Sequence, residues 1–232
     1  MPTSILPEFG RIQIVSKHRL TMKTKVFGIG FHKTGTTSLA NALSYLGYRV
    51  TGPNGVDNPN IAEEVHQMAF DLANRFDAFQ DNPWPVLYQE LDERFPGSKF
   101  ILTVRPTHDW IRSVVSHFNE DETPMREWIY GVGRPRGNEN LYIARYERHN
   151  REVIEYFKDR SKQLLVLNIT AGEGWTKLCA FLGETVPDAP FPCANAAPQR
   201  EKNDRRDKSW LWRTYFKIKR RAKALTLRSR AA

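Results

Sequence analysis

The sequence predicts a three-layer α/β fold, with a mostly parallel central sheet of about five strands and helices on both faces. Apolar runs of strand length alternate along the chain with longer segments of helical period, which is the pattern of successive βαβ units. The chain has 232 residues, 40% of them hydrophobic, which is enough for one domain with a substantial core. No apolar run approaches the roughly 20 residues that a membrane-spanning helix needs.

Each element is placed by its period and by the residues that start or stop it. The predicted strands are 26–30, 48–51, 76–80, 100–104 and 164–169. The predicted helices are 37–46, 60–75, 84–94, 108–118, 140–158 and 173–182. Asp57-Asn-Pro-Asn before Ile61 and Pro106-Thr before His108 are typical helix starts. Residues 119–138 lack a period and contain several Gly and Pro, so we expect an excursion or lid over a site.

Charge divides the chain into a neutral body and a basic tail. The formal net charge is +9, but from Arg200 onward 13 Lys/Arg stand against 3 Asp/Glu, whereas residues 1–199 hold 22 and 23. We therefore expect a poorly defined N-terminal extension (1–23), an α/β domain (24–198) and a basic amphipathic tail (199–232). A general nucleic-acid binder would show a basic face on its body, so no specific nucleic-acid partner is expected.

The tail admits two interpretations. Aromatic and basic residues follow each other with roughly helical spacing over 209–225. We favour a terminal helix that packs Trp210, Leu211 and Phe216 on the domain and solvates its charges; weak contact with an anionic membrane surface is the alternative. The first 20 residues show no apolar core flanked by a cleavage site, so we expect a cytoplasmic protein, peripheral at a membrane only through this tail. Cys179 and Cys193 lack metal-ligand spacing and are expected to be free thiols.

The strand predicted at 26–30 runs into a loop rich in glycine and hydroxyl groups that opens a helix. Such a junction binds anions, because loop N–H groups and the positive end of the helix dipole converge on one group. Gly30 and Gly35 have the spacing of the P-loop pattern G-x-x-x-x-G-K-[ST], but Thr36 occupies the lysine's place and Lys33 lies inside the loop. This P-loop-like arrangement fits nucleotide triphosphate hydrolysis poorly and another anionic donor well. A Gly/Thr turn without a ligand is the alternative.

Two groups of residues are candidates for binding this donor. The first is the loop itself, whose amides, hydroxyls and ammonium group could surround a phosphate or sulfate group. Its candidate residues are His32, Lys33, Thr34, Gly35, Thr36, Thr37 and Ser38. The second group follows the strand predicted at 100–104: Arg105 stands at the strand end, where ligands of open parallel sheets gather. Ser113 comes eight residues later, about two helical turns, and could share an anion with Arg105.

The two groups together resemble the donor site of sulfotransferases that use 3′-phosphoadenosine 5′-phosphosulfate (PAPS). Lys33-Thr-Gly-Thr-Thr-Ser is similar to their 5′-phosphosulfate loop, and Arg105 with Ser113 is similar to the pair that holds the 3′-phosphate. Further similarity to the compact soluble sulfotransferases lies in Asp81-Asn-Pro-Trp-Pro, Trp110, Gly174-Trp, Phe181-Leu-Gly and residues 187–192. The resemblance covers about 25–195.

The resemblance implies an enzyme that moves a sulfuryl group from PAPS to a hydroxyl or amine acceptor, on a small molecule, a glycan or a lipid. Lys33 would bind the phosphosulfate and stabilise charge on the bridging oxygen, while Thr34 to Ser38 would hold the 5′-phosphate. Arg105 and Ser113 would hold the 3′-phosphate. Sulfuryl carries less charge than phosphoryl, so no metal is required.

Two parts of the family pattern are missing here. Many cytosolic sulfotransferases carry a tryptophan after the loop, where this chain has Ser38-Leu39, so adenine stacking must come from elsewhere. Their C-terminal glycine-rich phosphate loop is also absent. The residues that could cover the 3′-phosphate instead are Arg200, Lys202, Arg205 and Arg206, among which the sequence does not choose.

The acceptor needs a general base, and Asp81 is our first choice for it. It follows the strand predicted at 76–80 and falls where the resembling enzymes place a catalytic His, Glu or Asp before a proline. A metal ligand or a helix cap are alternative roles for Asp81. His117 and His32 are the other candidates, although each could be a hydrogen-bonded structural histidine. His149 is left unassigned.

Two other functional classes stay open at this stage. A metal-dependent P-loop phosphotransferase would use the same loop for ATP, with Asp81 holding magnesium. A non-catalytic nucleotide-binding adaptor would keep the loop and bind a membrane surface through its tail.

Overall fold

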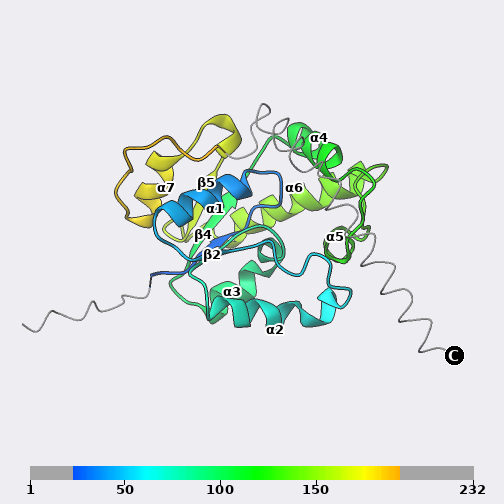
Figure 1. Cartoon of the computed structure of the whole chain (residues 1–232), viewed down its shortest axis with the longest axis horizontal. Coiled ribbons are helices and arrows are strands. Elements are labelled where there is room, and N and C mark those ends of the chain that lie inside the picture. Colours follow the sequence, from blue (N-terminus) through cyan, green and yellow to red (C-terminus); the bar gives the residue numbers. More distant parts are fainter. Residues whose placement is uncertain (1–22, 194–232) are drawn as a thin grey trace, which may run out of the picture.

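The structure, a computed structural model, describes residues 23–193 (Figure 1). The expectations for residues 1–22 and 194–232, including the whole basic tail, lie outside the described residues. Within residues 23–193 the sheet has five strands, all parallel, in the order β2-β3-β1-β4-β5. The predicted three-layer α/β fold is confirmed.

The elements follow the predicted alternation. The strands are β1 (Val26–Gly28), β2 (Val50–Thr51), β3 (Ala78–Phe79), β4 (Lys99–Thr103) and β5 (Leu164–Leu167). The α-helices are α1 (Thr36–Tyr45), α2 (Ile61–Ala73), α3 (Tyr88–Arg94), α4 (Thr107–Phe118), α5 (Pro124–Tyr130), α6 (Glu139–Tyr156) and α7 (Trp175–Leu182). Two 3₁₀ turns, η1 (Trp84–Leu87) and η2 (Ile169–Ala171), complete the order.

The structure corrects the sequence-based elements in two places. The helix predicted at 84–94 is split into η1 and α3; Pro85 lies within the 3₁₀ turn and lacks the N–H that a helix interior uses. The excursion predicted at 119–138 contains a helix, α5. Its start is a capped one: the Thr123 hydroxyl accepts a hydrogen bond from the Arg126 amide at 3.2 Å, and Pro124 occupies the first turn. A proline interpreted as a breaker therefore begins a helix.

The two faces of the sheet bury different helices. On one face, Val26 and Ile101 pack with residues of α1 and α7 in one buried cluster. On the other, Phe27 and Phe100 belong to a second cluster, which includes residues of α2, α3 and α6. Figure 1 shows α1 and α7 on one side of the sheet and α2 and α3 on the opposite side. Alternate strand residues are thus buried on opposite faces, as a parallel sheet covered on both sides requires.

The strand order places β1 in the centre, with β3 and β4 as its neighbours. The chain passes from β1 through α1 to β2 and β3 on one side, and then crosses to β4 and β5 on the other. Ligands of open parallel sheets bind outside the carboxyl ends of the strands at such a reversal point. The segments that follow β1, β3 and β4 therefore meet at one edge. No helix within residues 23–193 is long and apolar enough to span a membrane.

Candidate active site

A cavity of about 340 Å³ lies at this edge of the sheet. Nine of the eleven residues that the sequence singled out line it: His32, Lys33, Gly35, Thr36, Thr37, Ser38, Asp81, Arg105 and His117. Thr34 and Ser113 are buried, and neither is among the residues that line the cavity. The remaining walls come from Pro53, Val56, Asn82, Phe118, Thr123, Met125, Arg126 and Thr170.

The loop after β1 has the backbone shape of an anion cradle. Gly35 has a φ of 102° and caps α1, so the first amides of that helix face the loop. Lys33 has a φ of 66°, in the left-handed region that non-glycine residues seldom occupy. Backbone strain of this kind persists where the surroundings enforce it, and it gathers at functional sites. Lys33 lines the cavity from this conformation.

The loop is fastened to the carboxyl end of β4. A Cβ on Gly30 would lie 2.1 Å from the Thr103 hydroxyl oxygen, so only glycine permits this approach. The Thr34 hydroxyl lies 2.6 Å from the same Thr103 oxygen and donates to the Phe31 carbonyl at 2.6 Å. The Thr34 side chain therefore points into the protein, where its hydroxyl links the loop to β4.

Arg105 follows β4 and lines the same cavity as Lys33. Its Nη1 donates to the Lys33 carbonyl oxygen at 3.4 Å, across 72 residues of sequence. The cradle and the arginine, which the sequence placed on separate strands, are thus direct neighbours. Two positive side chains and a helix N-terminus share one cavity, and this arrangement suits a ligand with more than one anionic group.

Asp81 follows β3 and is held on both carboxylate oxygens. Oδ2 accepts a hydrogen bond from the Thr36 hydroxyl at 2.9 Å, and Oδ1 accepts one from the main-chain N–H of Asn82 at 2.8 Å. Burial raises the pKa of the Asp81 carboxyl, against the opposing effect of those two hydrogen bonds and of the Lys33 ammonium group. Its φ of 63° is the second left-handed non-glycine backbone in the cavity wall. A strained, desolvated carboxylate in a cavity has the properties of a proton acceptor.

His32 is buried, and both of its ring nitrogens contact neighbouring side chains. Asn82 Nδ2 donates to His32 Nδ1 at 3.2 Å, so the other ring nitrogen, Nε2, carries the proton and faces the Tyr130 hydroxyl at 3.3 Å. Burial, followed by the charges of Arg126, Lys33 and His117, lowers the pKa of His32 to about 3. His32 is therefore neutral at physiological pH, with both ring nitrogens engaged.

His117 and Ser113 lie one turn apart on α4 but differ in placement. His117 is exposed in the last turn and lines the cavity, with its ring 4.7 Å from that of Phe118. Ser113 is buried within the helix packing. The structure thus brings His117 to Lys33 and Asp81 along the cavity wall, whereas Ser113 is buried one turn earlier on the same helix.

Sequence reasoning missed Arg126, the cation that the excursion contributes. Arg126 is only 4% exposed and lines the cavity. Its Nε donates to the Gly133 carbonyl at 2.8 Å and its Nη2 donates to the Asp121 carbonyl, so one guanidinium ties together both limbs of the excursion. The guanidinium carbon of Arg126, Cζ, lies 4.5 Å from the centre of the Phe118 ring. The Thr123-Pro124 helix start, had it been recognised, would have placed Arg126 in a first helical turn.

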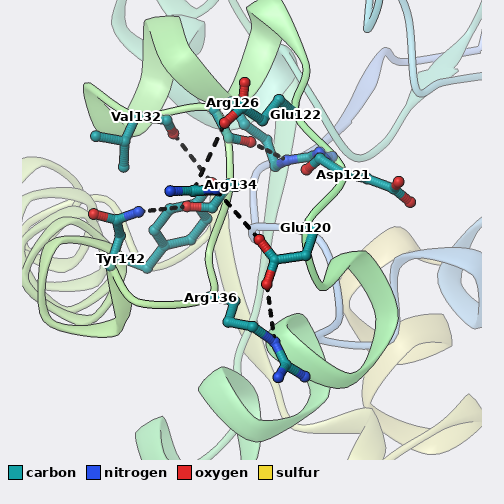
Figure 2. Close-up of polar contacts among 10 residues, drawn as sticks. Glu120, Asp121, Glu122, Arg126, Val132, Arg134, Arg136 and Tyr142 are labelled. Carbon is teal, nitrogen blue, oxygen red and sulfur yellow. Dashed lines mark hydrogen bonds and ion pairs between the residues drawn. The ribbon is translucent and has the colours of Figure 1, made fainter.

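Ion pairs on the outside close the excursion further (Figure 2). Arg134 lies 3.3 Å from a Glu120 oxygen and 3.7 Å from a Glu122 oxygen, and Arg136 lies 3.5 Å from Glu120. All four side chains are at least half exposed, so each pair contributes little to stability. The excursion is an ordered wall of the cavity, held mainly by Arg126.

These features define an α/β protein with a glycine- and hydroxyl-rich loop after β1, shaped to suit an anionic group and without a lysine at position 36, where nucleotide triphosphatases have one. The model of the sulfotransferase domain matches the chain over residues 25–138 and 124–200. The chain belongs to the sulfotransferase family, and the predicted family is confirmed. It is similar to "Ava biosynthesis cluster protein M" of Aspergillus versicolor, with 25% identity over 84% of this chain and 88% of the relative.

Proposed function

We propose that this sulfotransferase-family protein transfers a sulfuryl group from PAPS to a hydroxyl or amine acceptor. The observation that carries the proposal is the shared cavity of Lys33 and Arg105, with Arg105 Nη1 donating to the Lys33 carbonyl. PAPS carries a phosphosulfate at one end of its adenosine and a phosphate on the ribose. A site for it needs two anion-binding regions within the length of one nucleoside, and in our proposal the segments after the neighbouring strands β1 and β4 would provide them.

The residues present suit this donor. The amides at the start of α1, together with Lys33, would hold the 5′-phosphosulfate, and Arg105 would hold the 3′-phosphate. Ser113, buried on α4, would share the 3′-phosphate with Arg105. When bound, the donor supplies an activated sulfuryl group.

Proton transfer falls to Asp81, in our proposal. Its carboxylate would take the proton from the acceptor hydroxyl or amine, and its raised pKa brings it nearer to neutral pH, where general bases work best. Lys33 would stabilise negative charge on the oxygen that leaves the sulfuryl group. His117, exposed at the same cavity, is the second candidate base. Neutral His32 would orient Asn82 and the loop rather than move a proton.

Two measurements test the proposal. Calorimetry with 3′-phosphoadenosine 5′-phosphate (PAP) and with ADP should show tighter binding of PAP, because Arg105 recognises the ribose phosphate. Lys33→Ala should reduce turnover by roughly 10²–10³-fold, the usual loss of one electrostatic contact to the transition state. Equal affinity for PAP and ADP, or turnover of Lys33→Ala near that of the original chain, would contradict the assignment.

One contact also suits a metal-dependent phosphotransferase. The Thr36 hydroxyl and the Asp81 carboxylate are hydrogen-bonded, and such a pair can share a magnesium ion in ATP-binding P-loop proteins. Turnover with and without EDTA separates the two chemistries, since only the phosphotransferase requires the metal. Binding of PAP without transfer to any of a broad acceptor panel would instead favour a non-catalytic adaptor.

A further inference from the structure

One hydroxyl group from α6 holds the backbone of Arg105 on both sides. The Tyr146 hydroxyl accepts a hydrogen bond from the Arg105 amide at 3.0 Å and donates one to the Arg105 carbonyl at 2.8 Å. A phenol can do both at once, because its oxygen is both donor and acceptor. These bonds fix the backbone just beyond the end of β4, immediately before Pro106.

The ring of Tyr146 extends this contact to the cradle. It stacks on Trp110 of α4, with ring centres 4.1 Å apart and planes inclined by 9°. Trp110 in turn donates its indole N–H to the His32 carbonyl at 2.8 Å, inside the loop that contains Lys33. Tyr146 and Trp110 thus form one stacked unit, which we call the aromatic brace. Its Tyr146 hydroxyl bonds to the main chain of Arg105, and its Trp110 N–H bonds to the main chain of His32.

The brace is rigid and out of reach of a ligand. Tyr146 is 1% exposed and Trp110 is fully buried, and neither is among the residues that line the cavity. Stacked aromatic side chains have few rotamers and pack with dense, specific contacts. The Tyr146 hydroxyl therefore acts on a bound nucleotide only indirectly, through the backbone of Arg105, whereas its ring acts on the loop through Trp110.

We propose that Tyr146 is the positioning residue that sets recognition of the ribose 3′-phosphate, by holding Arg105 at a fixed place relative to the cradle. The inference rests on the proposed use of a 3′-phosphorylated donor. Without the hydroxyl, the Arg105 N–H and C=O lose their partner in a partly buried place, and the segment shifts to find others. The Arg105 side chain then starts from a displaced backbone, and its contact with the phosphate weakens.

The test compares PAP with AMP, which differ only by the 3′-phosphate. Calorimetry, with displacement of PAP for the weak ligand, gives the ratio of the AMP and PAP dissociation constants. Arg105→Ala should lower this ratio roughly 10- to 100-fold, the effect of a hydrogen bond between charged groups. Tyr146→Phe keeps the ring and its stacking, and should lower the ratio about fivefold or more while AMP binding stays within about twofold.

Tyr142→Phe is the matched control. Tyr142 lies one turn earlier on α6, is fully buried, stacks on Tyr130 and donates its hydroxyl to the main-chain carbonyl of Val132 at 3.2 Å. Both variants lose one buried phenol hydroxyl, so both should lose similar stability. Only Tyr146→Phe should change the ratio.

The double variant Tyr146→Phe/Arg105→Ala decides whether Tyr146 acts through Arg105. Once the guanidinium is gone, the tyrosine change should cause no further loss of the ratio. Trp110→Phe probes the other tip of the brace and should weaken AMP and PAP together, since the indole supports the cradle. It also provides a second measurement if Tyr146→Phe does not fold.

The outcomes separate the inference from the proposed function. If the original chain prefers PAP and Tyr146→Phe keeps that preference, the inference is wrong and the proposed donor stands. If Tyr146→Phe lowers the ratio equally with and without Arg105, the positioning role is wrong as well. If the original chain itself does not distinguish PAP from AMP, the proposed donor and the inference fall together.

Discussion

Replacing Asp81 by asparagine should make the protein inactive and more stable at the same time. Asp81 has a φ of 63°, and asparagine is among the residues that adopt this left-handed conformation most readily. The asparagine oxygen can keep the bond from the Asn82 amide, and its NH₂ can donate to the Thr36 hydroxyl oxygen, so both present contacts have neutral equivalents. The change also removes a carboxylate that burial disfavours.

The expected gain is about 0.5–2 kcal/mol, the range of single stabilising changes, and each 1 kcal/mol raises Tm by about 2–4 °C in a domain of this size. Turnover should fall about 10²–10⁴-fold, the usual contribution of a general base, while PAP affinity changes little. The pH dependence has a definite sign. Because the folded-state pKa is raised, the destabilising carboxylate is present above that pKa and is neutralised as pH falls through it, so the stability difference should shrink towards acid pH.

Differential scanning fluorimetry between pH 5 and 8, combined with a sulfuryl-transfer assay, measures both effects. Asp77→Asn is the matched control, because Asp77 precedes the other end of β3 and its carboxylate binds Arg49 through two hydrogen bonds of 2.8 Å. Hydrogen bonding to the Arg49 side chain is the main cause of the lowered pKa of Asp77. Asp77→Asn should therefore destabilise the protein and leave turnover intact. A lower Tm for Asp81→Asn, or full activity, would refute the reasoning.

Three further predictions follow from the packing of the site. Gly30→Ala should unfold the carboxyl end of the sheet, because its Cβ would meet Thr103 at 2.1 Å; we expect a loss of several kcal/mol, seen as a Tm drop of 5 °C or more, and an unchanged Tm would contradict it. The free energy of unfolding should fall as pH drops below about 6.5. Burial lowers the pKa of His32 to about 3 and of His149 to about 4, so each imidazole binds its proton only on unfolding. Urea titrations at pH 7 and 5 measure this, and His149→Gln should make the free energy of unfolding depend less on pH. Arg126→Lys should lower the free energy of unfolding by about 1–3 kcal/mol, because lysine cannot reach both carbonyls. Glu120→Gln should lower it by under about 1 kcal/mol, since it only removes exposed ion pairs. Equal Tm values for the two variants would show that Arg126 does not hold the excursion.

Local pattern predicted the sheet and the cradle, because both depend on short stretches of sequence. The apolar runs at 26–30 and 100–104 and the spacing of Gly30 and Gly35 carry that information within a few residues. Strand adjacency then brought Lys33 and Arg105 to one cavity, as a parallel sheet does with segments that follow its strands.

The supporting residues could not be predicted in the same way. Arg126 bonds main-chain carbonyls within its own excursion, and Tyr146 bonds the main chain of Arg105 across 41 residues; a hydrogen bond to a carbonyl leaves no mark on the identity of the residue that accepts it. The spacing after Arg105 predicted that Ser113 lies on the following helix; it lies on α4 and is buried there, and its role at the 3′-phosphate stays a prediction.

The position of Tyr146 late in the chain has a consequence for synthesis on the ribosome. The segment from Lys33 to Arg105 emerges first and holds two of the cations that line the cavity. The contacts that fix Arg105 and Ile29, however, come from α6, where Tyr146 and His149 bond to their main-chain atoms. A nascent chain that has not yet exposed α6 can pair β1 with β4 but lacks these supports. The proposed binding of a nucleotide should therefore begin only after about residue 150 has left the exit tunnel.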